Sequence, residues 1–138
     1  CDVCLSCFMQ SFELNDWMAV FTDIDATARL HDAVFDLWTR TSEKLSLMHH
    51  VVRYEDLISD LRGTASAAIR FLGLEWDDDM ARFHEHARNR GHLSTPSHSQ
   101  VTQPVYTHAI RRWKRYGAAM DGVAQFLESR RSALGYGD

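Results

Sequence analysis

Four side chains in this sequence stand where the local pattern favours binding of a phosphate or an aromatic group. Ser6 lies near the start of an expected helix, where a hydroxyl and free backbone N–H groups together bind anions. Tyr54 ends a short β-branched run, and ligands of α/β proteins gather at the carboxyl ends of strands. Ser97 lies in an extended loop, and Arg112 belongs to the basic run that follows it. Each of these residue types is also common in purely structural roles.

The basic run places four cations within five residues, on the helix expected after the loop: Arg111, Arg112, Lys114 and Arg115. Arginine offers N–H donors in a planar fork that matches phosphate oxygens, so the run could receive a phosphorylated ligand. A solvated basic face is the alternative, and it is the more common cause of such runs. The run alone therefore leaves both explanations open.

The three cysteines follow the spacing C-x-x-C-x-x-C at positions 1, 4 and 7. Iron–sulfur clusters use such spacing but require a fourth ligand. That ligand would have to be a histidine: His31, His49 or His50. Alternatively, the thiols line the packed face of a helix as small apolar groups, and this is the interpretation that we prefer. We therefore predict no metal site, and reduced thiols suit a cytoplasmic location.

The composition indicates an ordinary globular chain. Its 138 residues are 45% hydrophobic and 25% charged, which predicts a single domain over residues 1–138. The formal charge of −4 argues against nucleic-acid and membrane-surface binding, because both require a basic excess. No apolar run approaches the roughly 20 residues of a membrane span. His84 and His86 would point to opposite sides of a helix, which argues against a metal pair.

Helical periodicity and capping signals define the elements that must position these residues. The longest expected helix begins at Asp25 as its N-cap and runs to Ser46, with apolar residues at helical spacing along one stripe. Gly73 is a natural helix stop, and the Gly-, Ser- and Pro-rich segment from Asn89 to Val105 predicts a long functional loop. Shorter helices are predicted over residues 2–12, 63–72, 77–88, 107–116 and 119–134. The acidic run Asp77–Asp79 is expected to cap the helix over 77–88. In the last helix Met120, Val123, Ala124 and Leu127 are expected to face inward.

The run His49–Tyr54 predicts the one β-strand of the chain, so the expected fold class is mainly α with one short β-strand. A lone buried strand leaves the backbone groups on both its edges unpaired, which is costly. We therefore expect either partner strands, from an upstream segment or from a second copy of the chain, or a rearranged fold. The sequence also begins without methionine, at Cys1 and in the middle of an apolar pattern, which suggests a fragment.

Four segments resemble, in order, the sequence motifs of the PAPS-dependent sulfotransferases. Asp2–Phe8 resembles the segment after the Arg-x-Pro signature of the 3′-phosphate-binding motif. Arg53–Leu57 resembles the family's Tyr-Glu-Asp-Leu, and Phe71–Asp77 resembles the Phe-Leu-Gly-Leu-x-Trp stretch that follows it. Ser97–Tyr106, with Arg112 and Trp113, resembles the C-terminal nucleotide-binding loop and helix. The pattern is most similar to tyrosylprotein sulfotransferases and to bacterial sulfotransferases joined to tetratricopeptide repeats.

The resemblance implies a role for each of the four side chains in binding PAPS (3′-phosphoadenosine 5′-phosphosulfate), the family's co-substrate. By position, Ser6 matches the serine that hydrogen-bonds the 3′-phosphate, and Tyr54 matches the tyrosine near the adenine. Ser97 matches the loop serine on the nucleotide phosphates, and Arg112 falls where the family has a cation. The implied fold is the C-terminal part of the family's α/β P-loop-type fold, and the implied reaction is sulfuryl transfer to a hydroxyl acceptor.

Departures from the family pattern limit what this chain is expected to do. The phosphosulfate-binding loop, the arginine of the 3′-phosphate motif and the catalytic base are not found in the sequence, and the resemblance places them upstream of Cys1. We therefore expect a chain that is inactive alone and binds nucleotide weakly or not at all. The alternative is a truncated helical module without catalysis, which forms a homodimer through its exposed strand edge and apolar helix faces.

Overall fold

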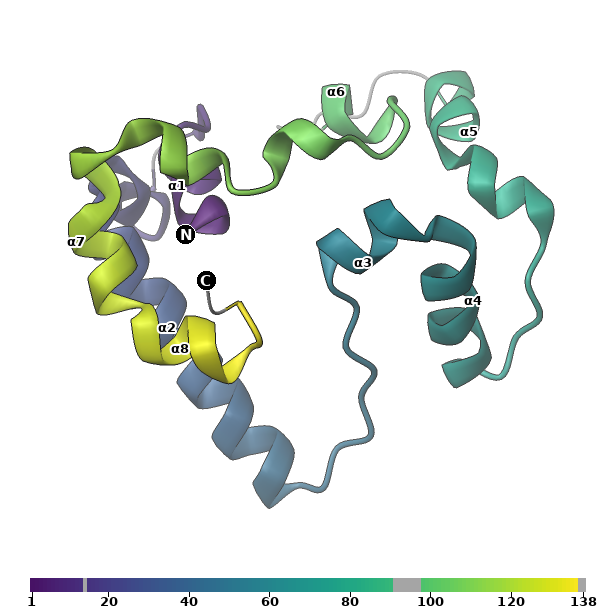
Figure 1. Ribbon diagram of the computed structural model, residues 1–138, viewed down its shortest axis with the longest axis horizontal. Coiled ribbons are helices and arrows are strands. Elements are labelled where there is room, and N and C mark those ends of the chain that lie inside the picture. The colour runs from purple at the N-terminus through teal and green to yellow at the C-terminus, as the bar shows by residue number, and fades with distance from the viewer. Residues whose placement is uncertain (14, 91–97, 137–138) are drawn as a thin grey trace. The chain divides into compact units, whose positions relative to one another are not determined.

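The computed structural model describes residues 1–13, 15–90 and 98–136, and its regular elements are helices (Figure 1). The α-helices are α1 (Asp2–Phe8), α2 (Ile24–Lys44), α3 (Tyr54–Ser59), α4 (Leu61–Phe71), α5 (Phe83–Asn89), α6 (His98–Val101), α7 (Ala118–Phe126) and α8 (Glu128–Ala133). The 3-10 helices are η1 (Met18–Thr22), η2 (Asp78–Arg82), η3 (Thr107–Ala109) and η4 (Arg112–Tyr116). These elements pack as two compact units: unit 1 comprises Cys1–Leu47 and Ala109–Asp138, and unit 2 comprises Met48–His108.

The longest helix, α2, belongs to unit 1 and is capped at its N-terminal end by a side chain. The carboxylate of Asp23 accepts a hydrogen bond from the N–H of Ala26 at 2.6 Å, which satisfies one free donor of the first turn. The prediction of Asp25 as the N-cap is therefore wrong. Asp25 instead lies in the first turn, where an acidic side chain interacts favourably with the helix dipole. The helix ends at Lys44, close to the predicted end.

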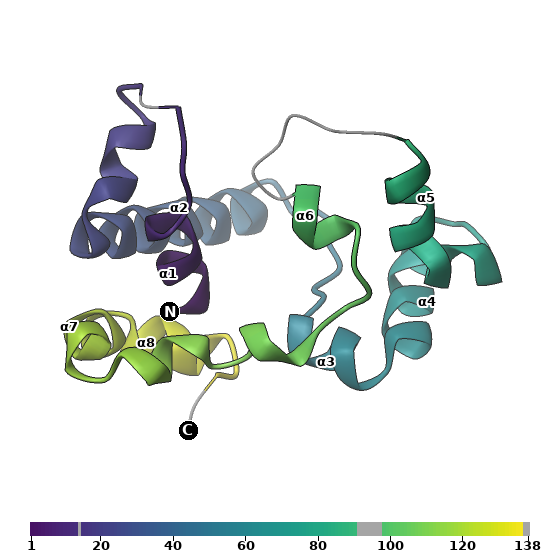
Figure 2. The same ribbon diagram turned by 90° about the horizontal axis from the view of Figure 1, so that it is seen from above.

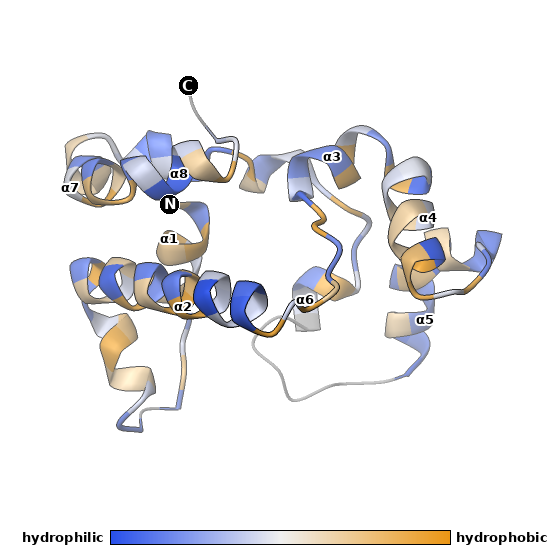
Figure 3. Cartoon of the chain, turned by 90° about the horizontal axis from the view of Figure 1, so that it is seen from below, coloured by the Kyte–Doolittle hydropathy of each residue, from blue (hydrophilic) through white to orange (hydrophobic). Residues whose placement is uncertain are grey.

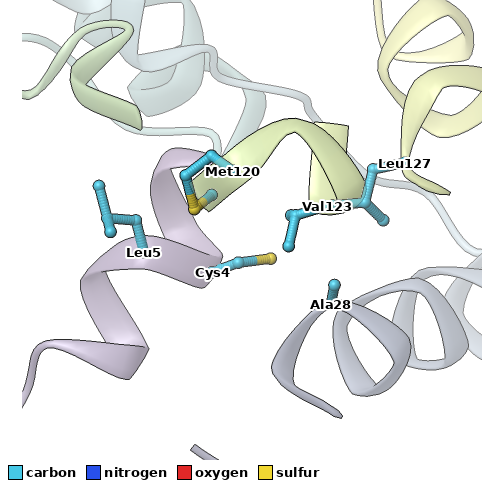
Figure 4. Packing of buried hydrophobic residues seen from close by; sticks show 6 residues of the cluster. All are labelled: Cys4, Leu5, Ala28, Met120, Val123 and Leu127. Carbon is cyan, nitrogen blue, oxygen red and sulfur yellow. The ribbon is translucent and has the colours of Figure 1, made fainter. Parts of the chain in front are cut away.

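Unit 1 has a hydrophobic core to which three helices contribute (Figure 4). Its buried members are Cys4 and Leu5 on α1, Ala28 on α2, Met120 and Val123 on α7, and Leu127, which follows α7. Figure 2 shows α1 between α2 on one side and α7 with α8 on the other. The predicted inward positions Met120, Val123 and Leu127 are confirmed. Cys4 is fully buried in this core, which confirms for this residue that the thiol packs as a small apolar group.

A second apolar face of α2 is left uncovered by the described residues. Val34, Leu37 and Leu45 recur at helical spacing and are 54%, 66% and 62% exposed. They form the stripe that the sequence periodicity identifies, whereas the buried side of α2 carries smaller residues such as Ala28 and Ser42. Figure 3 shows hydrophobic residues on α2 and in the segment that follows it. The apolar stripe is thus present on α2 as predicted, but the core of unit 1 packs against a neighbouring side of the helix.

An ion pair and a cation–π contact tie α8 to the rest of unit 1. Nε of Arg130 donates to Oδ1 of Asp32 on α2 at 2.8 Å, and both side chains are partly buried. The guanidinium of Arg131 lies over the ring of Trp113, 5.2 Å from its centroid. Trp113 itself packs against the buried core residues. These contacts fix the orientation of α8 and η4, which precedes α7 in the chain.

Unit 2 is built from short helices, and two of them, α4 and η2, are capped at their N-terminal ends by side chains. The Asp60 carboxylate accepts a hydrogen bond from the N–H of Gly63 at 2.8 Å, at the start of α4. Asp77 accepts from the N–H of Asp79, also at 2.8 Å, so the acidic run caps η2 as predicted. Gly73, just after α4, has a left-handed φ of 75°, which confirms the predicted helix stop.

The predicted strand over His49–Tyr54 is not confirmed, because the described part of the chain contains no strand. The residues before Tyr54 lack regular structure, although Arg53 keeps extended backbone angles of −92° and 139°. Tyr54 begins α3 instead of ending a strand. β-branched residues favour a strand only where a partner strand completes its hydrogen bonds. The fold is mainly helical, and none of the described helices is both long and apolar enough to cross a membrane.

Four predicted helices are shortened or divided in the structure, and the one predicted over residues 77–88 consists of η2 and α5. The first ends at Phe8 instead of residue 12. The helix predicted over residues 107–116 is divided into η3 and η4, which are separated at Arg111 by a left-handed φ of 52°. The last predicted helix is divided into α7 and α8 at Leu127. Each break occurs in a run without Gly or Pro, so these sequences carry no strong signal for it.

Candidate functional site

The carboxylate of Asp2 joins α1 to η4 within unit 1. Its Oδ2 accepts a hydrogen bond from the N–H of Arg111, and its Oδ1 accepts one from the N–H of Trp113, both at 2.9 Å. These two residues flank Arg112, so a single side chain fixes the backbone on both sides of this cation. The left-handed conformation of Arg111 costs a non-Gly residue roughly 1–2 kcal/mol, which the two hydrogen bonds offset.

Arg112 extends from η4 towards α1. Its Nη2 donates to the Sδ of Met9 at 3.2 Å, and the hydroxyl of Tyr116 donates to the same sulfur at 3.5 Å. A thioether is a weak and neutral acceptor, so it leaves the positive charge of the guanidinium uncompensated. Among the described residues, no carboxylate forms an ion pair with Arg112. The guanidinium therefore keeps its charge for an anion.

Ser6 lies on the same face of α1 as the two residues that contact η4. Asp2 and Ser6 lie on α1 and Met9 is its C-cap residue, and their spacing of i, i+4 and i+7 places them in one row. Ser6 is exposed and is the fifth residue of α1, beyond the free N–H groups of the first turn. Its hydroxyl is therefore the group that it can offer a ligand. The structure thus brings Ser6 and Arg112 to two elements that contact each other.

Tyr54, in unit 2, contacts the segment that follows the predicted loop. Its hydroxyl donates to the carbonyl oxygen of Tyr106 at 3.0 Å and accepts from the N–H of the same residue at 3.5 Å. The two rings meet edge to face, with centroids 6.3 Å apart. Tyr106 in turn stacks on His108, with centroids 4.1 Å apart and the ring planes 10° from parallel. Tyr54, Tyr106 and His108 form what we call the aromatic cluster.

Ser97 lies outside the described residues, so its predicted role has no structural counterpart here. The residues just after it are held beside α5. Arg88, near the end of α5, donates from Nε to the carbonyl oxygen of Thr102 at 2.8 Å. The amide of Gln103 donates to the carbonyl oxygen of Ser99 at 2.9 Å. The end of the predicted loop is therefore fixed by hydrogen bonds before the chain reaches the aromatic cluster.

Burial affects the ionisation of two of the three cysteine thiols. Burial raises the pKa of the Cys4 thiol and also the pKa of the Cys7 thiol, which disfavours the reactive thiolate. All three cysteines are free thiols. In the described ranges, no three His, Cys, Asp or Glu side chains gather as they would around a metal ion. What the described residues offer a ligand is hydrogen-bond donors, positive charge and aromatic rings.

Comparison with protein-family models matches residues 1–78 to the Sulfotransferase family. The matched segment covers more than half of the 138 residues and includes Ser6 and Tyr54. The chain belongs to the sulfotransferase family. Membership implies a sulfonate donor such as PAPS and an acceptor for the sulfuryl group. Neither the curated proteins nor the solved structures give a match.

The four predicted site residues differ in the support that the family match gives them. Ser6 and Tyr54 lie inside the family match, whereas Ser97 and Arg112 lie beyond residue 78, so their roles rest on the sequence resemblance. Sequence reasoning missed Asp2, because its partners on η4 are 109 and 111 residues away in the chain. An acidic residue at the first position of a helix is itself unremarkable, and nothing in the sequence identifies the partner.

Proposed function

We propose that this chain binds PAPS, the donor from which members of its family move a sulfuryl group to a hydroxyl acceptor. In this proposal Ser6, Ser97 and Arg112 contact phosphate groups of the nucleotide, and Tyr54 contacts its adenine. The observation that carries the proposal is the pairing of α1 with η4. This pairing brings an exposed hydroxyl and a guanidinium with an uncompensated charge to neighbouring elements.

The donors of unit 1 fit a phosphate group well. Arg112 presents a planar fork of N–H donors, and charge-assisted hydrogen bonds to phosphate are stronger than its bond to the Met9 sulfur. A phosphate oxygen can therefore replace the thioether with a net gain. Ser6 adds a hydroxyl donor from the facing row of α1. Arg111 and Arg115 are exposed on the same segment and add attraction for an anion.

The aromatic cluster of unit 2 fits a nucleotide base. Stacking of a base on an aromatic side chain contributes about 1–3 kcal/mol and does not depend on the base edge. The hydroxyl of Tyr54 is already bonded to the backbone of Tyr106, so its ring is the part that can contact the adenine. Tyr106 and His108 extend this aromatic surface along the chain.

The proposal assigns binding, and not bond making, to these residues. In sulfuryl transfer the acceptor oxygen bonds to sulfur while the bond from sulfur to the phosphate oxygen breaks, and the acceptor proton passes to a base. Developing charge on the leaving phosphate needs positive groups, a role that Arg112 suits. The family's phosphosulfate loop and catalytic base have no counterpart that we recognise in this sequence. We therefore expect this chain alone to bind weakly and not to transfer sulfuryl groups.

Calorimetric titration with 3′,5′-ADP, the nucleotide that remains after sulfuryl transfer, tests the proposal. We expect saturable binding with a Kd of about 1 mM, or roughly −4 kcal/mol. Arg112→Ala removes a charge-assisted contact and should weaken binding about tenfold or more. Ser6→Ala should have a smaller effect in the same direction. Arg29→Ala and Ser129→Ala, which change exposed residues of the same types elsewhere in unit 1, serve as matched controls.

Two results would count against the proposal. One is the absence of saturable binding at nucleotide concentrations up to about 10 mM. The other is binding that Arg112→Ala and Arg29→Ala weaken equally, because this would indicate general attraction by positive charge. Adenosine, which lacks both phosphates, is a further comparison and should bind more weakly than 3′,5′-ADP if the phosphate contacts are real.

Self-association is a second candidate function, and the exposed stripe of α2 favours it. Val34, Leu37 and Leu45 form an apolar row long enough to pack against the same row of a second copy. We expect light scattering to find a homodimer, and Leu37→Glu to convert it to a monomer. Val101→Glu, at an exposed apolar residue of unit 2, is the control. A wild-type chain that stays monomeric at high concentration would exclude this candidate.

A further inference from the structure

Asp2 contacts the proposed phosphate site without belonging to it. Its two carboxylate oxygens each accept a backbone N–H at 2.9 Å, from the residues immediately before and after Arg112. An acidic side chain beside a phosphate would normally repel the ligand. Here both oxygens are engaged by N–H donors, which offset part of the negative charge. The carboxylate of Asp2 therefore repels a bound phosphate less than a free carboxylate would, and its two hydrogen bonds give it a structural role beside the site.

The two hydrogen bonds enforce an unusual backbone conformation. Arg111 has a φ of 52°, in the left-handed region that non-Gly residues rarely adopt. Without the carboxylate, Arg111 is free to return to the right-handed region, and the first residue of η4, Arg112, would then change direction. Its guanidinium would no longer extend to Met9, the C-cap residue of α1. The geometry of the guanidinium thus depends on a side chain 110 positions earlier in the sequence.

We propose that Asp2 is a positioning residue for the phosphate site. It holds the backbone around Arg112 so that the guanidinium lies along the face of α1 that carries Ser6. The row Asp2, Ser6 and Met9 supports this assignment, because its first and last members contact η4 on either side of Ser6. This inference rests on the proposed function and adds to it the residue that couples α1 to the C-terminal cation.

Titration with 3′,5′-ADP of position-2 variants of the full chain tests the assignment. Asp2→Ala should weaken binding about as much as the loss of the Arg112 contact, by about tenfold or more. Asp2→Asn keeps one acceptor oxygen, but its amide N–H faces the second backbone N–H and cannot accept a hydrogen bond from it. We therefore expect an intermediate loss of affinity for 3′,5′-ADP. Asp2→Asn also serves as the milder variant if Asp2→Ala does not fold. Asp32→Ala, which breaks the ion pair with Arg130, is the control for general destabilisation of unit 1.

A double-mutant cycle with Arg111→Gly separates positioning from a merely structural role. Glycine adopts the left-handed region without strain, so the backbone conformation no longer depends on the carboxylate. Asp2→Ala should therefore weaken nucleotide binding less in the Arg111→Gly background than in the wild-type background. Because the cycle compares two differences, it cancels the lost charge of Arg111. A general loss of stability would not be relieved by added backbone flexibility.

The outcomes distinguish this inference from the proposed function. If the wild-type chain binds no 3′,5′-ADP, the proposed function fails and the inference fails with it. If the wild-type chain binds and Asp2→Ala binds equally well, only the inference fails. It also fails if Asp32→Ala weakens binding as much as Asp2→Ala, or if Arg111→Gly leaves the effect of Asp2→Ala unchanged.

Discussion

Unit 1 and unit 2 are both helical but are stabilised differently. All of the fully buried side chains among the described residues lie in unit 1. Unit 2 has half-buried residues such as Ala65, Ala68 and Ile69 on α4, and capping bonds such as that of Asp60, but none of its described residues is fully buried. Both units contain amphipathic helices. The difference is that α2 packs against both α1 and α7, whereas α4 packs mainly against the short α3.

This contrast separates the two sets of proposed ligand contacts. Ser6 and Arg112 stand on elements of unit 1 that a buried core supports. Tyr54 stands on an element that hydrogen bonds and ring contacts hold in place. A contact that is already ordered loses less conformational entropy on binding. We therefore expect the phosphate contacts to dominate the affinity, and the base contacts to add a smaller contribution.

The largest difference in stability between the two units is expected when a core residue of unit 1 is truncated. Leu127 is 1% exposed, and Leu127→Ala should lower the free energy of unfolding by about 2–5 kcal/mol, because it leaves a cavity. The matched change in unit 2, Ile69→Ala, removes a half-buried side chain and should cost only about 1 kcal/mol. Urea unfolding followed by circular dichroism measures both changes.

Amide hydrogen exchange provides the control for this pair. Amides of α2 and α7 should be protected more strongly than those of α4, and Leu127→Ala should remove that difference. Equal costs for the two substitutions, together with equal protection, would show that unit 2 has as firm a core as unit 1.

Two glycines should respond to alanine with opposite signs. Gly73 in unit 2 has a φ of 75°, and Gly73→Ala should destabilise the chain by about 1–2 kcal/mol because alanine is strained in this conformation. Gly122 lies inside α7 of unit 1, and an added Cβ would meet no atom within 4 Å. Gly122→Ala should therefore stabilise α7 by about 0.5–1 kcal/mol. Thermal unfolding measures both, and a shift of the same sign for the two variants would contradict the conformational argument.

Local signals in the sequence predict several of these features correctly. The stop at Gly73, the cap formed by the Asp77 run and the inward positions of α7 all depend on residues within a few positions of each other. The position of α2 is likewise clear from its periodicity. Its N-cap is less so, because Asp23 and Asp25 are both good capping residues and only the backbone conformation distinguishes them.

Features that depend on distant partners are the ones that the sequence does not reveal. The β-branched run before Tyr54 predicts a strand, but a strand needs a partner and the described residues provide none. The break at Arg111 lies where the backbone donates two hydrogen bonds to Asp2. Asp2 is too distant in the sequence for a local pattern to predict these bonds. Among the candidate site residues, Ser6 and Arg112 could be named from their motifs. The carboxylate between their elements could be found only from the structure.

A smaller effect is expected at the hydrogen bonds between Tyr54 and Tyr106. Tyr54→Phe removes the hydroxyl that donates to the carbonyl oxygen at 3.0 Å, and should destabilise the chain by about 0.5–1.5 kcal/mol. The matched control is Tyr116→Phe in unit 1, because that hydroxyl donates only to the Met9 sulfur at 3.5 Å. Its removal should have almost no effect on the urea midpoint. Equal effects at the two tyrosines would show that the hydrogen bond to Tyr106 does not contribute measurably to the free energy of unfolding.

The smallest effect concerns the pH dependence of unit 1. Burial lowers the pKa of His31, whose ring stacks on Phe35 with centroids 4.8 Å apart. The neutral imidazole is thus favoured in the folded chain, while the unfolded chain takes up a proton near the ordinary value of about 6.5. As the pH falls through that value, the unfolded state binds more protons and the free energy of unfolding decreases. The free energy of unfolding stops decreasing only when the pH falls below the lowered pKa of His31 in the folded chain.

Urea unfolding of wild type and His31→Gln at pH values of about 8 and 5.5 tests this expectation. Between these values the wild-type chain should lose more stability than His31→Gln, because glutamine has no proton to gain. His86→Gln, at an exposed histidine of unit 2, is the matched control. Since Asp32 beside His31 acts in the opposite sense to burial, the difference should be modest. Parallel pH profiles for wild type and His31→Gln would mean that this histidine is solvated well enough to charge in the folded chain, and that unit 1 is less firmly packed around α2 than its buried residues indicate.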